Sequence, residues 1–242
     1  MRRILAIGGG GFLMENAVSP IDKYLRELTG NPRPRICLIS TPSGDAQEHI
    51  DAFYKAYSSN VCEPSNLAVF RKPAPGAVAL SRFEEHLIVQ DAIFVGGGNT
   101  KSALGAWREW GIDSALSRAY TSGVLPAGMS AGAMCWFECG LTDSYWGEGY
   151  RPLKCLGLLP GGCGVHYHVE PERRSRLYAA IEIGAIPASV AIDDFAAILY
   201  EDEKPVRTLR WRIGAGAYSV SLRAGQVVEE ALECVDIDIA ET

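Results

Sequence analysis

Short apolar runs alternate with amphipathic segments along most of the chain. The runs end in glycine, serine or other loop-forming residues, which is the pattern of buried strands followed by loops. Strands are predicted at residues 3–7, 35–40, 66–70, 92–95 and 124–127. Helices are predicted at residues 20–30, 45–57 and 82–89, from Asn99 or Thr100 onward, after Ser130, and at 171–183. Repeated strand–helix units predict an α/β fold, a parallel sheet covered by helices on both faces.

The pattern changes after Ser189. Two runs, 196–200 and 206–210, flank a polar segment and predict a hairpin, and the run 218–222 is predicted to extend the same sheet. The chain should therefore finish in a small antiparallel annex. Because no internal repeat, low-complexity tract or long linker interrupts it, residues 1–242 are predicted to form a single domain.

Composition and charge exclude several classes of protein. Hydrophobic residues make up 48% of the chain and charged residues 21%, fractions typical of a globular protein. The formal charge of -6 argues against a nucleic-acid-binding surface. No apolar stretch approaches the ~18 residues that a membrane-spanning helix requires. The seven cysteines include no C-x-x-C pair, which indicates reduced thiols and a cytoplasmic location.

The sharpest chemical signal is the segment Gly128–Gly132, which has the form G-x-S-x-G around Ser130. It stands between a predicted strand and a predicted helix, where a tight turn projects the serine hydroxyl at the carboxyl edge of a sheet. The helix start also supplies free amides for a developing oxyanion. The segment therefore predicts a nucleophile, although a plain tight turn would have the same spacing.

A nucleophilic serine needs a base, because its hydroxyl is a weak nucleophile at neutral pH. Of the histidines, His49 and His86 fall inside predicted helices and are expected to be surface or packing residues. His166 and His168 follow a glycine-rich stretch and would share one face of a strand, so the sequence leaves two candidates.

A third group must orient the imidazole of the base. Asp143 lies between Ser130 and His166, which gives the chain order Ser, Asp, His of other hydrolases with such a turn. Glu138, Glu148 and Glu170 are its competitors.

A second glycine turn, Gly96–Thr100, suits a backbone oxyanion donor beside the serine, a phosphate cradle or simply a sharp turn. The run Gly8–Gly11 resembles a nucleotide-binding loop, but Leu13 stands where that motif needs glycine. Cys163 with His166 and His168 has spacing for zinc but no evident fourth ligand. Another cysteine, Cys135, is expected to be a buried small apolar residue rather than a nucleophile.

Together these segments resemble the dipeptidase E family of serine peptidases, which also includes cyanophycinase. The resemblance covers most of the chain and is strongest from Ala92 to Arg174. The segments that carry it are Val95–Thr100, Ala127–Ala133, Thr142–Asp143, and Leu159–Pro160 followed by His166.

The resemblance implies a three-layer sandwich similar to class I glutamine amidotransferases, and hydrolysis of short peptides without cofactor or metal. In the best-known members the N-terminal residue of the substrate is aspartate. By matching positions, Ser130 would be the nucleophile, His166 the base and Asp143 the orienting acid. The oxyanion would be held by amides near Gly97 or Gly98 and Ala131, and Asn99 and Thr100 would contact substrate.

The chain departs from the family pattern at two positions beside the histidine. Val165 stands where the family typically has proline, and His168 where an acidic residue is often found. These departures place the chain nearer an uncharacterised bacterial branch than the aspartyl dipeptidases. If the substrate does carry aspartate, a cation should meet it, and Arg151, Arg173 and Arg174 are the candidates.

The sequence thus favours a cytoplasmic serine peptidase whose partner is a small peptide, with a homodimer as the assembly to consider and neither nucleic acid nor membrane. Two alternatives stay open. One is an esterase or amidase for a non-peptide acyl group, and the other is a non-catalytic binding domain that keeps the serine turn.

Overall fold

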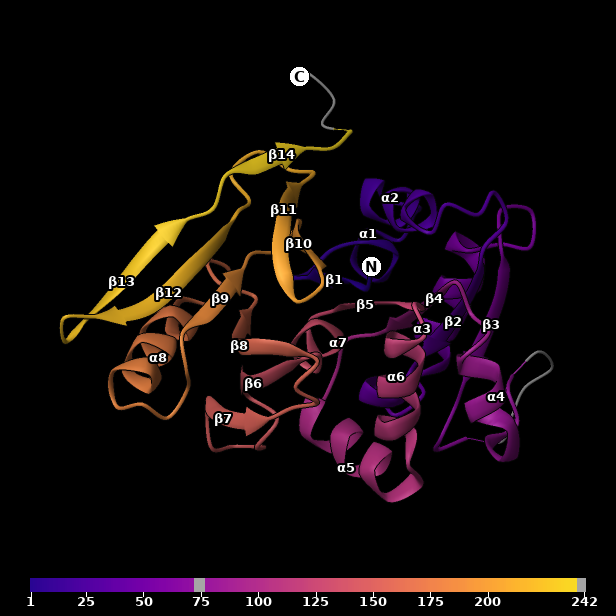
Figure 1. Ribbon diagram of the computed structural model, residues 1–242, viewed down its shortest axis with the longest axis horizontal. Helices are drawn as coiled ribbons and strands as arrows, with labels where there is room; N and C mark the ends of the chain where they lie inside the picture. Colours follow the sequence, from indigo (N-terminus) through magenta and orange to yellow (C-terminus); the bar gives the residue numbers. More distant parts are fainter. Residues whose placement is uncertain (72–76, 239–242) are drawn as a thin grey trace.

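A computed structural model describes residues 1–71 and 77–238. Within these residues, two sheets lie side by side, and helices cover the larger one (Figure 1). The larger sheet has eight strands in the order β14-β11-β10-β1-β5-β4-β2-β3. Its bounds are β1 (Arg3–Ile7), β2 (Arg35–Ile39), β3 (Glu63–Leu67), β4 (Ala92–Val95), β5 (Leu125–Met129), β10 (Ala196–Glu201), β11 (Lys204–Arg210) and β14 (Cys234–Asp236).

The neighbouring strands β1, β5, β4, β2 and β3 are parallel to one another, as the strand–helix alternation predicts. The hairpin β10–β11 is antiparallel and joins the free side of β1, so it extends this sheet. The α/β class is therefore confirmed.

Alternation along the strands divides the core into two layers. Leu5 and Ile7 of β1 face one side, and Ile4 and Ala6 face the other. On the first side lie α1 (Phe12–Glu15), α2 (Pro20–Leu28) and α3 (Gln47–Ala56). On the second side lie α4 (Phe83–Leu87), α5 (Thr100–Trp110), α6 (Ile112–Thr121) and α7 (Ala131–Met134). Two 3₁₀ turns, Thr41–Ser43 and Leu80–Arg82, complete this part of the chain.

The smaller sheet has six strands within the described residues, in the order β13-β12-β9-β8-β6-β7. Its central strands β6, β8 and β9 are parallel, and the outer strands pair antiparallel. The helix α8 (Pro171–Glu182) packs on this sheet through an apolar cluster that includes Leu177 and Ile181. The strands are β6 (Phe137–Thr142), β7 (Arg151–Lys154), β8 (Leu159–Val165), β9 (Ser189–Ile192), β12 (Ala217–Arg223) and β13 (Gln226–Ala231).

The prediction that 218–222 extends the sheet of the C-terminal hairpin is wrong. This segment is β12, and it pairs with β9 and β13 in the smaller sheet. The antiparallel strands at the C-terminal end are therefore divided between the two sheets instead of forming a separate annex.

In the described ranges, no helix is long and apolar enough to cross a membrane.

Candidate active site

Ser130 occupies the sharp turn between β5 and α7. Its backbone has φ 59° and ψ -114°, a conformation that non-glycine residues rarely adopt. Glycine is required on both sides of the turn. A Cβ on Gly128 would lie 2.3 Å from the carbonyl oxygen of Gly132, and one on Gly132 would lie 2.0 Å from that of Val95. The Ser130 amide donates to the Ile7 carbonyl at 3.0 Å, which fixes the turn over the sheet.

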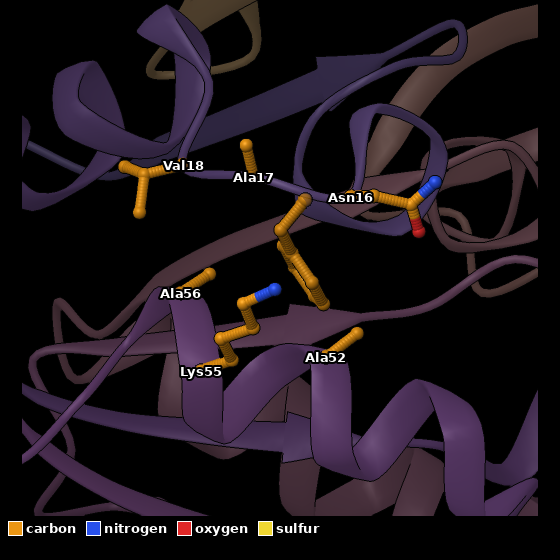
Figure 2. A pocket seen from close by; sticks show the side chains of 7 residues that line it. Asn16, Ala17, Val18, Ala52, Lys55 and Ala56 are labelled. Atoms are coloured by element: carbon orange, nitrogen blue, oxygen red, sulfur yellow. The ribbon is translucent and has the colours of Figure 1, made fainter.

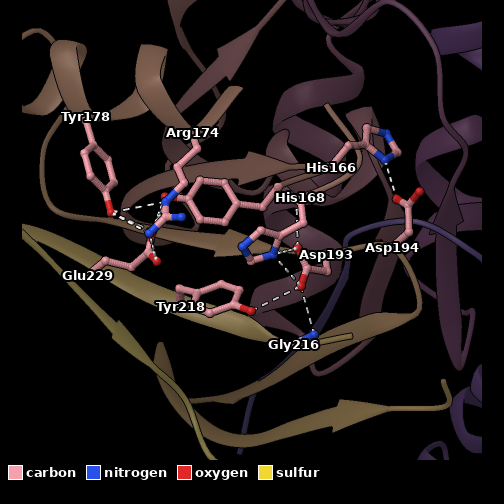
Figure 3. Close-up of polar contacts among 10 residues, drawn as sticks. His166, His168, Arg174, Tyr178, Asp193, Asp194, Gly216, Tyr218 and Glu229 are labelled. Carbon is pink, nitrogen blue, oxygen red and sulfur yellow. Dashed lines mark hydrogen bonds and ion pairs between the residues drawn. The ribbon is translucent and has the colours of Figure 1, made fainter. Parts of the chain in front are cut away.

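His166 follows β8 and connects Ser130 to a carboxylate. Its Nε2 lies 2.6 Å from Ser130 Oγ, and its Nδ1 lies 2.6 Å from Asp194 Oδ1 (the second contact is drawn in Figure 3). The side chains of His166 and Asp194 are 19% and 9% exposed. If Nδ1 carries a proton and donates it to the carboxylate, the lone pair of Nε2 is free to accept the serine proton.

Asp194 comes just after β9, the neighbour of β8 in the smaller sheet. Gly9, two residues after the end of β1, forms a parallel bridge with Asp194. A Cβ on Gly9 would lie 2.0 Å from Asp194 Oδ1 and 3.1 Å from His166 Nδ1. The glycine run after β1 therefore allows the main sheet to approach the histidine–carboxylate pair closely.

The structure does not bring Asp143 to the histidine. Asp143 is exposed after β6, and among the residues described it has no hydrogen bond or ion pair with His166. The next residue, Ser144, contacts Asn99 and Thr100, so this loop leads to the Gly96–Thr100 turn. The competing glutamates are engaged elsewhere as well: Glu138 accepts from the Gly161 amide, Glu148 pairs with Arg151, and Glu170 pairs with Arg173.

The Asp194 contact was missed because Asp194 follows His166 in the chain, against the expected order. The available signal was the pair Asp193-Asp194 directly after the apolar segment of β9. Because parallel strands end at a common edge, acids at that position come near a histidine that ends the adjacent strand.

The predicted oxyanion donors lie on two turns. A Cβ on Gly97 would lie 3.5 Å from Ser130 Cβ, so the Gly96–Thr100 turn adjoins the serine. Within the described chain, the amides of Gly97, Gly98 and Ala131 have no hydrogen-bond acceptor. Gly98 has φ 137°, and a Cβ there would lie 2.1 Å from the Pro42 carbonyl oxygen, so glycine shapes this turn.

Asn99 and Thr100 are placed to hold the loop after β6. The Asn99 side chain accepts from the Ser102 amide at 2.8 Å and donates to the Ser144 carbonyl at 3.2 Å. Thr100 is buried, and its amide donates to Ser144 Oγ at 2.9 Å. Direct contact of either residue with substrate stays a prediction.

The three candidate arginines differ in burial, and each already has a carboxylate partner. Arg151 and Arg174 are exposed and pair with Glu148 and Glu229 at 2.6 and 2.8 Å. Arg173 is only 2% exposed and lies 2.6 Å from Glu170. Its guanidinium also donates to the Leu141 carbonyl at 3.3 Å and lies 4.6 Å from the centre of the Tyr150 ring.

The residues of the zinc alternative do not converge. His166 contacts Ser130, whereas His168 contacts Asp193 and Cys163 is buried. Across the part of the chain that the structure describes, no group of three or more His, Cys, Asp and Glu side chains is placed to hold a metal ion.

An apolar pocket of about 370 Å³ lies elsewhere, between the α1–α2 connection and α3 (Figure 2). Its lining residues include Phe12, Val18 and Lys55 but none of the Ser130–His166–Asp194 series. The candidate site is therefore located by the contacts of Ser130, His166 and Asp194 and not by this pocket.

A serine on a strained strand-to-helix turn, an imidazole and a carboxylate in series are the arrangement of a serine hydrolase. Comparison with known proteins narrows this class. Residues 4–207 match Peptidase family S51, and the chain belongs to that family. It is 39% identical over 229 residues to the uncharacterized peptidase YgaJ of Bacillus subtilis (strain 168), covering 95% of this chain and 96% of that protein. The resemblance to serine peptidases is thus confirmed, and the chain is a serine-type peptidase.

Two solved structures share the fold. A peptidase from an acI-B1 Actinobacterium has a TM-score of 0.68 at 13% identity, with 96% of this chain and 97% of that chain covered. A putative peptidase E protein from Listeria monocytogenes EGD-e has a TM-score of 0.65 at 18% identity, with 88% and 100% covered.

Proposed function

We propose that the chain hydrolyses short peptides through an acyl-enzyme, with Ser130 as nucleophile, His166 as base and Asp194 as the group that orients the base. One observation carries this proposal: the His166 imidazole lies between Ser130 Oγ and Asp194 Oδ1, 2.6 Å from each. Asp194 takes the role that chain order assigned to Asp143.

The reaction follows from these contacts. His166 Nε2 takes the proton of Ser130 as Oγ attacks the peptide carbonyl, and Asp194 stabilises the imidazolium that forms. The amides of Gly97 or Gly98 and Ala131, which have no acceptor within the described residues, receive the oxyanion, a contribution of about 10²–10³ in rate for each donor. His166 then protonates the leaving amine, and water hydrolyses the acyl-enzyme.

Dipeptides with an N-terminal aspartate are part of the proposal, with Arg173 as the cation that meets the side chain. Arg173 lies in the first turn of α8, just after the turn that carries His166. Its partner Glu170 is ionised at neutral pH. Burial acts to raise the pKa of Glu170, but hydrogen bonds from Tyr150 and Arg173 and the nearby positive charge lower it overall. An incoming aspartate must therefore compete with Glu170 for Arg173.

The test is a panel of Xaa-Leu dipeptides, including Asp-Leu, incubated with the protein and with its Ser130→Ala variant. We expect cleavage by the unaltered protein and loss of turnover, with folding unchanged, in the variant. Ser122→Ala, which alters an exposed serine at the end of α6, is the control and should cleave normally.

A fluorophosphonate probe separates the alternatives. Labelling at Ser130 without cleavage of any dipeptide would replace the peptide proposal by an esterase or amidase. Absence of both labelling and cleavage would favour a non-catalytic binding domain, and turnover by Ser130→Ala would refute the mechanism.

A further inference from the structure

A second histidine–carboxylate pair lies beside the first one. His168 Nδ1 is 3.0 Å from Asp193 Oδ1 and 3.1 Å from Asp193 Oδ2, and the two pairs are seen together in Figure 3. Each acid is adjacent in sequence to the acid of the other pair, and one residue separates the histidines. The His168 side chain is half-exposed, whereas Asp193 is only 4% exposed.

Asp193 joins three separate segments. Its carboxylate accepts hydrogen bonds from the His168 amide at 3.1 Å, the Gly216 amide at 3.0 Å and the Tyr218 hydroxyl at 3.5 Å. The turn after β8, the end of β9 and the start of β12 therefore meet at one buried carboxylate. A buried charge requires partners of this kind, so the contacts fix these segments relative to one another.

The contacts of Asp193 lie next to His166, whose backbone conformation is unusual. His166 has φ 130°, in a region that residues other than glycine rarely adopt. Such a conformation persists only where its surroundings hold it. The next two residues provide that support: buried Tyr167 donates its hydroxyl to Glu229, and His168 binds Asp193 twice, through its amide and its imidazole.

We propose that His168 and Asp193 form a positioning pair, which holds the strained His166 turn so that its imidazole stays aligned between Ser130 and Asp194. The inference rests on the proposed roles of Ser130 and His166. His168 itself does not contact Ser130; it acts through the backbone of the turn and through the shared segment Asp193-Asp194.

Two substitutions at His168 distinguish hydrogen bonding from ring packing. The imidazole also packs edge-on against the rings of Tyr167 and Tyr218, at centroid distances of 5.4 and 5.1 Å. His168→Asn keeps a donor near the position of Nδ1 but loses the ring, whereas His168→Phe keeps a ring but loses the donor. His86→Phe is the matched control, because His86 bonds Ser65 and Gln90 beside the far edge strand β3.

The readouts are kcat and KM for a cleaved dipeptide and the rate of fluorophosphonate labelling, measured at a temperature where each variant is folded. We expect His168→Phe to lower kcat and the labelling rate by up to about 10²-fold with KM nearly unchanged, since it misplaces the base without touching substrate. His168→Asn should stay within a few-fold of the unaltered protein, and His86→Phe should match it.

Loss in His168→Asn alone would overturn the proposal in favour of ring packing, and equal loss in both variants would overturn it because the hydrogen-bond donor would then not be what holds the turn. Unchanged rates in both would overturn it as well. Failure of the proposed function is separately visible, because it would appear as turnover or labelling in Ser130→Ala whatever residue stands at 168.

Discussion

Each nitrogen of the His166 ring has a single partner, and this pairing determines what the residue can do. Nε2 can accept the Ser130 proton only in the tautomer that carries hydrogen on Nδ1, and Asp194 Oδ1, 2.6 Å from Nδ1, favours that tautomer. Asp143 is exposed on the loop that leads toward Asn99, so it is not placed to do this.

Substitutions of Asp194 and Asp143 are therefore expected to have different effects on kcat. Asp194→Asn should lower kcat by about 10⁴-fold, because an amide can donate to Nδ1 and favour the wrong tautomer, as in other serine peptidases. Asp143→Asn, the control, should change kcat by less than about 3-fold, in line with a surface substitution. Steady-state kinetics on the same dipeptide measure both, and the reverse ranking would restore Asp143 as the orienting acid.

The sequence indicated the Ser130–His166 contact but not the contact between His166 and Asp194, because the second contact depends on the pairing of two strands and not on a local motif. The serine turn is a local pattern of five residues, and His166 was one of the two histidines that the sequence left as candidates for the base. Asp194 reaches His166 only because β8 and β9 become neighbours, with Val165 opposite Ile192. Such a register depends on the whole sheet and is not written in any local segment.

At the scale of single elements, α2 contains a buried carboxylate near its start. Asp22 is 1% exposed and accepts from the Ser19 amide at 2.9 Å and the Tyr57 hydroxyl at 3.0 Å. Burial raises its pKa to about 6, more than these hydrogen bonds lower it. The ionised form is therefore disfavoured in the folded protein.

Because of this shift, the contribution of Asp22 to the free energy of unfolding should decrease as the pH rises. Between about pH 4 and 6 the folded protein holds the Asp22 proton while the unfolded chain has released it, so the contribution decreases across this window and is constant above it. The loss is roughly 3 kcal/mol. Asp22→Asn removes the titration, and its stability relative to the unaltered protein should increase over the same window.

Urea unfolding at pH 4.5 and pH 7 measures this difference. Asp113→Asn, which changes a partly exposed carboxylate in the first turn of α6, should give the same difference as the unaltered protein. An Asp22→Asn variant whose relative stability does not depend on pH would contradict the prediction.

Elements with strong apolar periodicity were predictable, and those fixed by distant partners were not. The strands β1 and β4 match their apolar runs, and α2 begins at Pro20 as expected. The helix predicted from residue 45 begins only at Gln47, and the buried carboxylate of Asp45 binds Ser40 and the backbone of the segment after β3. The strand β8 was also hard to predict, because its sequence is rich in glycine and has too few side chains to show alternating apolar and polar positions.

At the scale of the whole molecule, the site is assembled by both sheets. Ser130 comes from the end of β5 in the larger sheet, whereas His166 and Asp194 come from the ends of β8 and β9 in the smaller sheet. The carboxyl ends of parallel strands thus meet from two directions, a common position for active sites in α/β proteins. The start of α8 also carries Glu170 and Arg173, the charged pair that is proposed to face the substrate.

Glu170 and Arg173 lead to a prediction about substrate choice. In Glu170→Gln the guanidinium keeps a hydrogen-bond acceptor but loses its neutralising charge, so a substrate carboxylate no longer competes with one from the protein. We expect kcat/KM for Asp-Leu relative to Leu-Leu to rise by about 10-fold, equivalent to about 1.4 kcal/mol of added attraction. Glu148→Gln, which removes the partner of the exposed Arg151, is the matched control and should leave the ratio unchanged. The ratio in Glu170→Gln could instead stay constant while the variant remains folded. In that case Arg173 does not bind the substrate side chain, and its charge serves only to hold the turn between β8 and α8.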